Sequence, residues 1–143
     1  MDEQKRDMIG VGYMVGKPEQ VFLDERWKGI MGAIDRALPD TVNQFVSFDD
    51  AETVGVLAAS SSTQPTRYYL FDFVNNKLEW MADSRPWVEA AQMSEMKPYS
   101  FEARDGRLLH GYLTVPHGSD GKNLPLIVNP HGGPWARDGW RYN

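Results

Sequence analysis

A chain of 143 residues with 41% hydrophobic and 24% charged residues has the composition of a soluble globular protein and argues against disorder. Its formal net charge of −5, with lysines and arginines scattered along the sequence, disfavours a nucleic-acid partner or an anionic membrane surface. No apolar run approaches the roughly 18 residues needed to span a bilayer, and the lack of cysteine excludes disulfides and thiolate metal sites.

The first predicted elements are two short strands and a helix. Residues 8–22 alternate loosely between apolar and polar and break at residues 16–18, which predicts two strands around a turn. Asp24 can cap a helix that runs to about Leu38 and is ended by Pro39. One face of this helix is apolar, so we expect the helix to pack on a sheet; the face consists of Trp27, Ile30, Met31, Ile34 and Leu38.

Three glycines in the first segment, Gly10, Gly12 and Gly16, could suggest a dinucleotide-binding loop. Their spacing is G-x-G-x-x-x-G, one residue longer than the fingerprint, with no strand before it and no helix directly after it. We therefore interpret them as strand-edge glycines and expect no cofactor.

Four strand-like runs of similar length follow, separated by clusters of turn-forming residues. This spacing predicts an antiparallel meander, which is the arrangement of one β-propeller blade. A single four-stranded sheet has two unpaired edges, so we expect neighbouring blades outside this sequence. The predicted strands are residues 42–48, 53–60, 67–73 and 77–82.

A domain boundary is predicted after the meander. Residues 83–96 lose the strand pattern and predict a short helix that crosses between two domains. Two further strand runs, residues 99–104 and 107–114, flank the dipeptide Asp105-Gly106, which favours a type I′ turn. We therefore divide the chain into a propeller part (1–84, with its helix at about 24–38), a linker (85–97) and the start of a second domain (98–143).

The last stretch of the sequence carries the predicted chemistry. The uncharged run from Leu124 to Val128 predicts a strand buried on both faces of a mostly parallel sheet. It is followed by His131-Gly132-Gly133-Pro134, a loop in which two residues without side chains let the main chain approach a ligand. In α/β-hydrolases, a backbone N–H from an HGGG-type loop helps to hold the oxyanion that forms when a serine attacks a carbonyl group. We expect this role here.

Other candidate catalytic residues fit less well. His117-Gly118-Ser119-Asp120-Gly121 nearly spells a nucleophile elbow, but the elbow needs glycine where this chain has His117, and it needs a helix after the serine. We therefore expect Ser119 not to be a nucleophile. His131 has no second ligand at metal-binding spacing and is expected to shape the loop, and His110 is expected to be a surface or edge residue.

The same residues carry a resemblance to a known family. The segments are Glu102-Ala103-Arg104-Asp105-Gly106, Gly111-Tyr112-Leu113-Thr114-Val115-Pro116, Leu124-Pro125-Leu126-Ile127-Val128 and His131-Gly132-Gly133-Pro134-Trp135-Ala136-Arg137-Asp138. Together they resemble the prolyl oligopeptidase family of serine peptidases, in its dipeptidyl aminopeptidase/acylaminoacyl peptidase branch. The resemblance is strong from Tyr99 onward and looser before it.

The resemblance implies a mixed fold, with the C-terminal part of a β-propeller followed by the first strands of an α/β-hydrolase domain. It implies a serine peptidase that hydrolyses bonds near the N-terminus of short peptides through an acyl-enzyme. The amide of Gly133 would then help to hold the oxyanion, with Gly132 and His131 shaping the turn. In the family the nucleophile, acid and base follow this loop, so we expect the chain alone to be inactive.

Four further expectations remain open. The main alternative function is a stand-alone β-rich interaction module that binds peptides by adding a strand at an open edge, with a vestigial glycine turn. A lipase-like esterase shares the oxyanion loop, but such esterases carry no propeller. Unsatisfied sheet edges and exposed apolar faces predict self-association of the chain. The sequence leaves its compartment, cytoplasmic or periplasmic, undecided.

Overall fold

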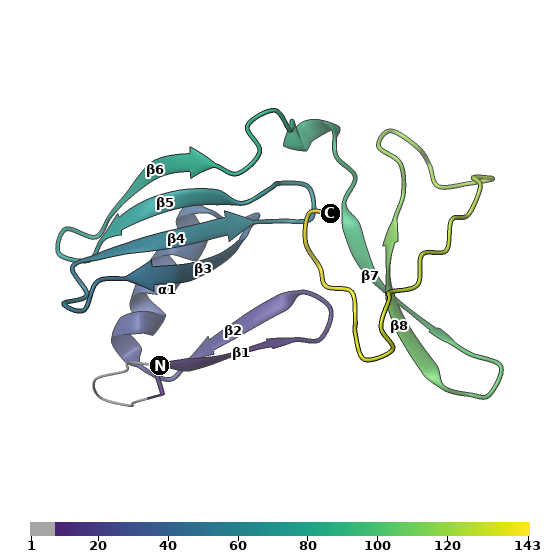
Figure 1. Cartoon of the computed structure of the whole chain (residues 1–143), viewed down its shortest axis with the longest axis horizontal. Coiled ribbons are helices and arrows are strands. Elements are labelled where there is room, and N and C mark those ends of the chain that lie inside the picture. Colours follow the sequence, from purple (N-terminus) through teal and green to yellow (C-terminus); the bar gives the residue numbers. More distant parts are fainter. Residues whose placement is uncertain (1–7) are drawn as a thin grey trace.

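The structure, a computed structural model, describes residues 8–143 and consists of antiparallel sheets with one α-helix (Figure 1). Residues 1–7, with which the predicted propeller part begins, lie outside the described residues. In chain order the elements are β1 (Gly10–Met14), β2 (Pro18–Phe22), α1 (Glu25–Ala37), β3 (Val42–Phe48), β4 (Val54–Ser60), β5 (Arg67–Asp72), β6 (Lys77–Asp83), a 3-10 turn η1 (Ala90–Gln92), β7 (Met96–Glu102) and β8 (Leu108–Thr114).

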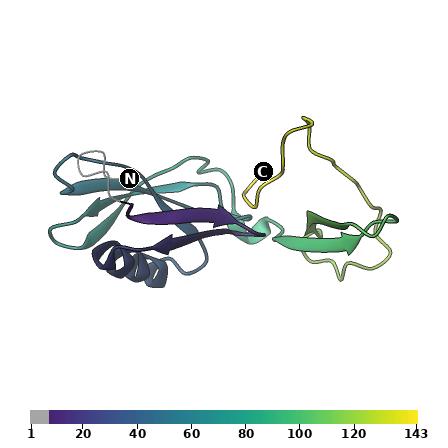
Figure 2. The same ribbon diagram turned by 90° about the horizontal axis from the view of Figure 1, so that it is seen from below.

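The first hairpin and the helix are confirmed. β1 and β2 pair antiparallel, with Met14 opposite Pro18 at the turn. The side chain of Asp24 accepts a hydrogen bond of 3.0 Å from the amide of Trp27 and so caps α1 at its N-terminus. Helix α1 lies along one face of the larger sheet (Figure 2).

The predicted meander is also confirmed. Strands β3, β4, β5 and β6 form one four-stranded antiparallel sheet in sequential order. The pairing shifts by one residue between Phe45 and Ser47 and again between Tyr68 and Tyr69, which are bulges in the edge strand β3 and in the pairing of β5 with β6.

The hydrophobic core lies between α1 and this sheet. It is built from the apolar stripe of the helix and from aromatic residues on one sheet face: Trp27, Met31, Ile34, Leu57, Phe71 and Phe73. The rings of Phe71 and Phe73 meet edge to face with centroids 4.9 Å apart. A Cβ at Gly55 would lie 2.9 Å from the ring of Phe73, so glycine is required for the rings to pack here.

The segment predicted as an interdomain helix differs in part from the prediction. Instead of a helix across residues 83–96, β6 extends to Asp83, β7 begins at Met96, and a 3-10 turn of 3 residues lies between them. In a segment this short, the few helical hydrogen bonds that could form do not offset the free energy needed to nucleate an α-helix. The segment also has no apolar stripe to bury.

The second hairpin is confirmed, but the predicted type I′ turn is wrong. β7 and β8 pair antiparallel with Glu102 opposite Leu108, one residue away from the register that a two-residue turn at Asp105-Gly106 requires, and Gly106 is at φ +79 while Asp105 is not at positive φ. The amide of Gly106 donates to the carbonyl of Ala103 at 3.0 Å, and Ala103 donates to Arg107 at 2.8 Å. This is a three-residue loop with glycine in the left-handed position, a conformation that aspartate adopts less readily.

The predicted buried strand at residues 124–128 is wrong. These residues form no strand, and Leu126, Ile127 and Val128 are 79%, 88% and 76% exposed. Strand formation requires a hydrogen-bonded neighbour, and no strand of residues 8–143 lies beside this run.

The fold confirmed by these elements is a β-rich chain of antiparallel sheets with one helix. Within residues 8–143, no helix has the length and apolar character required to cross a lipid bilayer.

Candidate functional site

The glycine loop, residues 131–134, lies in an exposed part of the chain. The segment from residue 120 to residue 138 has no helix or strand and is exposed throughout. After β8 this segment arches away from the four-stranded sheet and from the β7–β8 hairpin, and the chain then returns toward β7 (Figure 2). Trp135, directly after the loop, is 98% exposed.

Gly133 has the conformation that most clearly requires glycine. Its φ is +147, and a Cβ built on it would lie 2.9 Å from the amide nitrogen of Trp135 and 3.2 Å from that of Ala136. At Gly132 the same test finds nothing within 4 Å. The two glycines therefore differ, because the shape of the loop depends on Gly133 and tolerates a side chain at Gly132.

His131 contacts the loop itself. Its Nδ1 lies 2.8 Å from the carbonyl oxygen of Gly132, and since a carbonyl oxygen only accepts, Nδ1 carries the proton in this contact. This bond holds the imidazole against the backbone of the turn. Within the described residues, the amides of Gly132 and Gly133 donate no hydrogen bond to another protein group, so both N–H groups are available to an acceptor.

The other sequence candidates lie elsewhere. The hydroxyl of Ser119 accepts a hydrogen bond from the amide of Gly121 at 3.1 Å, as in an ordinary polar turn. His110 is exposed in β8 and contacts the hydroxyl of Ser100, its cross-strand neighbour, at 2.9 Å. Neither residue has the geometry of a catalytic triad, which needs a serine, a base and an orienting acid in hydrogen-bond contact.

Among the hollows on the surface of the described residues are the following two, and the glycine loop lines neither. One, of about 350 Å³, lies between the 3-10 turn region and the loop after β8 and includes His117 and Ser119. The other, of about 560 Å³, lies between the first hairpin and the α1–β3 region. Within residues 8–143, no three histidine or carboxylate side chains gather as the ligands of a metal ion would.

The perturbed titratable groups lie at the turns of the sheets, away from the glycine loop. The side-chain amide of Asn75, together with backbone amides, lowers the pKa of Asp72 below its ordinary value. Hydrogen bonds from Thr53 and Val54 lower the pKa of Asp49 in the same way. These carboxylates order the β3–β4 and β5–β6 connections and carry no catalytic geometry.

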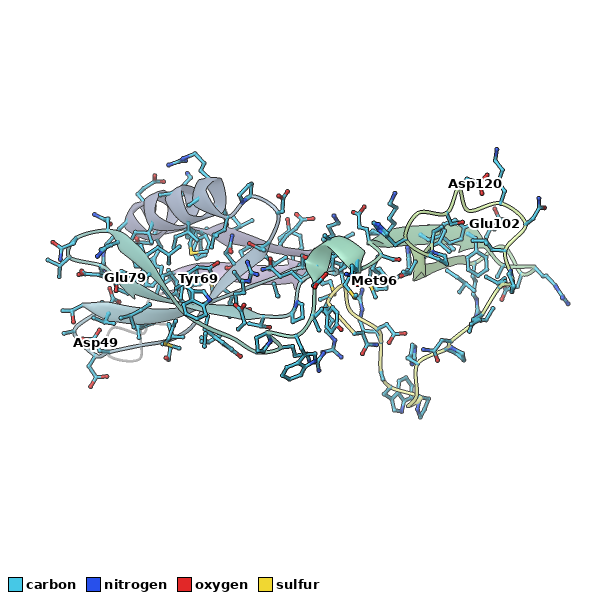
Figure 3. All side chains as sticks on the ribbon, turned by 90° about the horizontal axis from the view of Figure 1, so that it is seen from above. Asp49, Tyr69, Glu79, Met96, Glu102 and Asp120 are labelled. Atoms are coloured by element: carbon cyan, nitrogen blue, oxygen red, sulfur yellow. The ribbon has the colours of Figure 1, made fainter. Side chains whose placement is uncertain are left out.

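One buried residue was not singled out from the sequence. Trp140 is 7% exposed, and its indole Nε1–H donates a 2.7 Å hydrogen bond to the carbonyl of Met96. Met96 is labelled in Figure 3, where the C-terminal chain lies against the start of β7. A tryptophan within the polar run from Arg137 to Asn143 was the available signal, because a large apolar side chain in such a run needs a place to bury.

The sequence is similar to two curated dipeptidyl peptidases. It is 31% identical over 144 residues to dipeptidyl aminopeptidase BIII of Pseudoxanthomonas mexicana, covering 89% of this chain and 21% of the relative. It is 24% identical over 159 residues to dipeptidyl peptidase family member 6 of Caenorhabditis elegans, covering 96% of this chain and 22% of the relative. No family model matches the chain, and no solved structure matches it significantly.

The chain spans about a fifth of the length of these curated relatives. The two alignments nevertheless extend over 89% and 96% of this sequence. The resemblance to the dipeptidyl aminopeptidase branch of the prolyl oligopeptidase family is thereby confirmed, and the chain is a homologue of dipeptidyl peptidases along most of its length.

Proposed function

We propose that this chain is the part of a serine peptidase in which a β-propeller meets an α/β-hydrolase domain. The enzyme hydrolyses bonds near the N-terminus of short peptides, and the chain contributes its oxyanion loop. The observation that carries this proposal is the alignment with dipeptidyl aminopeptidase BIII over 89% of the chain.

The architecture supports this placement. The four-stranded meander β3–β6 has the form of one propeller blade, and the hairpin β7–β8 follows it across a short link. We place the domain boundary in that link, with residues 1–84 in the propeller part, 85–97 as the linker and 98–143 opening the catalytic domain.

The geometry of the glycine loop supports its chemical role. A serine that attacks a peptide carbonyl generates negative charge on the carbonyl oxygen, and a backbone N–H without a partner can hold that charge. Gly133 supplies the amide, while Gly132 and His131 shape the turn. Such a donor lowers the barrier by about 2.7–4 kcal/mol, but only when a nucleophile is present to create the charge. The chain alone is therefore inactive.

The test compares this chain with the longer protein obtained by translating the DNA beyond Asn143. The longer protein is expected to cleave dipeptidyl chromogenic substrates and to lose activity to a serine-directed reagent, whereas the purified 143-residue chain cleaves none. In the longer protein, Gly133→Ala should lower kcat by about 10²–10³ because the donor is displaced. Gly111→Ala is the matched control, since nothing lies within 4 Å of a Cβ there.

Reagent-sensitive cleavage by the 143-residue chain itself would contradict the proposal. So would a Gly133→Ala variant that retains full kcat. A stop codon directly after Asn143 would favour the second candidate function instead.

That second candidate is a stand-alone module that binds extended peptides. The observation in its favour is the hollow of about 560 Å³ between the first hairpin and the edge strand β3. In this hollow the backbone carbonyl of Asn43 in β3 accepts a 3.0 Å hydrogen bond from the side-chain amide of Gln20. Calorimetric titration of the chain with apolar extended peptides separates the two candidates, because a peptidase fragment has no reason to bind them along β3.

A further inference from the structure

The chain that follows the glycine loop returns to the protein around Trp140. Residues 120–138 are all exposed, but Trp140 is buried to 7% exposure and hydrogen-bonds through Nε1 to the carbonyl of Met96 at 2.7 Å. Burying the indole ring stabilises this contact because apolar surface is removed from water. The Nε1–H keeps a hydrogen bond, so no donor is left unsatisfied.

The residues around Trp140 include the tip of the first hairpin, residues 14–17. The Nζ of Lys17 lies 4.8 Å from the centre of the Trp140 ring, a cation–π contact, and Lys17 also pairs with Glu95 at 3.7 Å. On the other side of the tip, the guanidinium of Arg137 donates to the carbonyl of Met14 at 3.4 Å. A Cβ on Gly139 would lie 3.5 Å from the end of the Met14 side chain, so the two residues are in contact.

The same hairpin tip is held by the second hairpin. The hydroxyl of Tyr112 in β8 donates to the carbonyl of Gly16 at 2.7 Å. A Cβ on Gly16 would lie 3.2 Å from the ring of Pro98, closer than ordinary contact, so the tip packs tightly against β7. Met96 is tied in turn to the four-stranded sheet, because its amide donates to the hydroxyl of Ser62 at 3.1 Å.

Three parts of the chain therefore meet at this junction, which consists of the hairpin tip, Met96 and Tyr112 of the second hairpin, and the returning segment that ends in Trp140. Figure 1 shows the C-terminal segment returning to the space between the four-stranded sheet and β7. Only five exposed residues, 134–138, separate Gly133 from the returning contact at Gly139. The contacts at this junction therefore determine the direction in which the glycine loop, residues 131–134, runs from the rest of the protein.

We propose that Trp140 is a positioning residue for the glycine loop, and that it acts by fastening the segment after Gly133 to the hairpin tip. The orientation of the Gly133 amide then depends on contacts made more than a hundred residues earlier in the sequence, at residues 14–17. The link to oxyanion binding rests on the proposed function, whereas the positioning of the amide does not.

The experiment follows the glycine amides by NMR in chain labelled with ¹⁵N-glycine, in the Ile127→Lys background to suppress association through the exposed run 124–128. Lys17→Ala removes the cation over Trp140, and Tyr112→Phe removes the hydroxyl bound to Gly16. Lys28→Ala is the matched control, because Lys28 is also an exposed lysine in an ion pair, with Glu25 at 3.2 Å, but lies on α1. Trp140→Phe retains an aromatic ring and removes the hydrogen bond to Met96.

Lys17→Ala, Tyr112→Phe and Trp140→Phe are each expected to shift the Gly133 amide signal, while Lys28→Ala leaves it unchanged. Loss of one hydrogen bond should also speed trypsin cleavage after Arg137 by about 2- to 10-fold, with cleavage after Lys122 unaffected. If Trp140→Phe does not fold, Lys17→Ala and Tyr112→Phe decide the question. A Gly133 signal unmoved by those two variants would overturn the proposal. Because no substrate is used, this failure is distinct from failure of the peptidase assignment, which the longer protein tests.

Discussion

The hydroxyl of Tyr112 donates a hydrogen bond of 2.7 Å to the carbonyl oxygen of Gly16, a residue 96 positions earlier in the chain. This bond joins the second hairpin to the tip of the first. It lies beside Trp140, whose indole is bound to Met96 at the start of β7. The two predicted domain parts are thus connected by specific polar contacts and not only by the linker between them.

Removing the hydroxyl in Tyr112→Phe should reduce the free energy of unfolding by about 0.5–1.5 kcal/mol, because the Gly16 carbonyl loses its donor in a half-buried place. Urea unfolding followed by tryptophan fluorescence measures the change. Tyr99→Phe is the control: Tyr99 is 52% exposed and its hydroxyl has no partner among residues 8–143, so its effect should stay within about 0.5 kcal/mol. Equal effects from the two variants would mean that the junction contact does not stabilise the chain.

A substitution at the centre of the hydrophobic core should reduce the free energy of unfolding by more than Tyr112→Phe does. Leu57 in β4 is 0% exposed and lies in the cluster formed with α1. Leu57→Ala should therefore lower the free energy of unfolding by about 2–5 kcal/mol, because apolar burial is lost and a cavity is left behind. Leu70→Ala, on the neighbouring strand at 38% exposure, should cost clearly less. Denaturant midpoints of the two variants measure the difference, and a reversed order would show that the core lies on the other face of the sheet.

Most of the elements could be predicted because their signals are local. The cap at Asp24, the helical stripe and the alternation in the meander are each recorded within about 15 neighbouring residues, and the structure contains all of them. The turn at Asp105-Gly106 was predicted with the wrong geometry, because sequence preference does not separate a two-residue loop from a three-residue loop with glycine at its end.

The remaining features depend on contacts that a local pattern does not record. An apolar run such as residues 124–128 becomes a strand only when neighbouring strands accept and donate its hydrogen bonds, and no strand of residues 8–143 lies beside it. The junction around Trp140 joins residues as far apart as Lys17 and Trp140, so no periodicity announces it. For the glycine loop, the spacing of His131, Gly132 and Gly133 indicated the chemistry, while the requirement for glycine specifically at position 133 follows from its φ of +147.

The stability of the sheet should depend on pH through Asp72. Its carboxylate accepts hydrogen bonds from the side-chain amide of Asn75 at 2.8 Å and from the backbone amides of Asn75 and Val74 at 2.9 and 2.8 Å, and these bonds lower its pKa in the folded state. A carboxyl group with a lowered folded pKa contributes stability that is present above its ordinary pKa of about 3.9 and is lost as pH falls through the folded value. Unfolding midpoints measured between neutral and acidic pH should therefore decline in acid.

In Asp72→Asn this acid-dependent decline should be weaker, and in the double variant with Asp49→Asn weaker still, since the pKa of Asp49 is lowered for the same reason. Asp50→Asn is the control, because Asp50 is exposed in the same connection as Asp49 and accepts no hydrogen bond within the described residues. If the single and double variants reproduce the acid dependence of the unaltered chain, the turn carboxylates do not govern it.

Exposed apolar surface should make the chain associate with itself. Leu126, Ile127 and Val128 form a continuous run of 76–88% exposed side chains, and Tyr99 and Phe101 of β7 are about half exposed. Both strands of the β7–β8 hairpin have a free edge, because that sheet contains only these two strands. An exposed, uncharged and β-competent run in a chain that also has open strand edges is the usual setting for association between chains.

Sedimentation velocity at micromolar concentration should therefore detect dimers or larger species, and Ile127→Lys should shift the distribution toward monomer by placing a charge within the run. Val15→Lys is the matched control, because Val15 is also highly exposed, at 80%, but stands alone at the hairpin tip. A monomeric chain that melts cooperatively at the same concentration would contradict this prediction and would favour a stand-alone module. Association that persists unchanged in Ile127→Lys would instead assign the contact to another surface, for which the face of β7–β8 with Tyr99 and Phe101 is the next to vary.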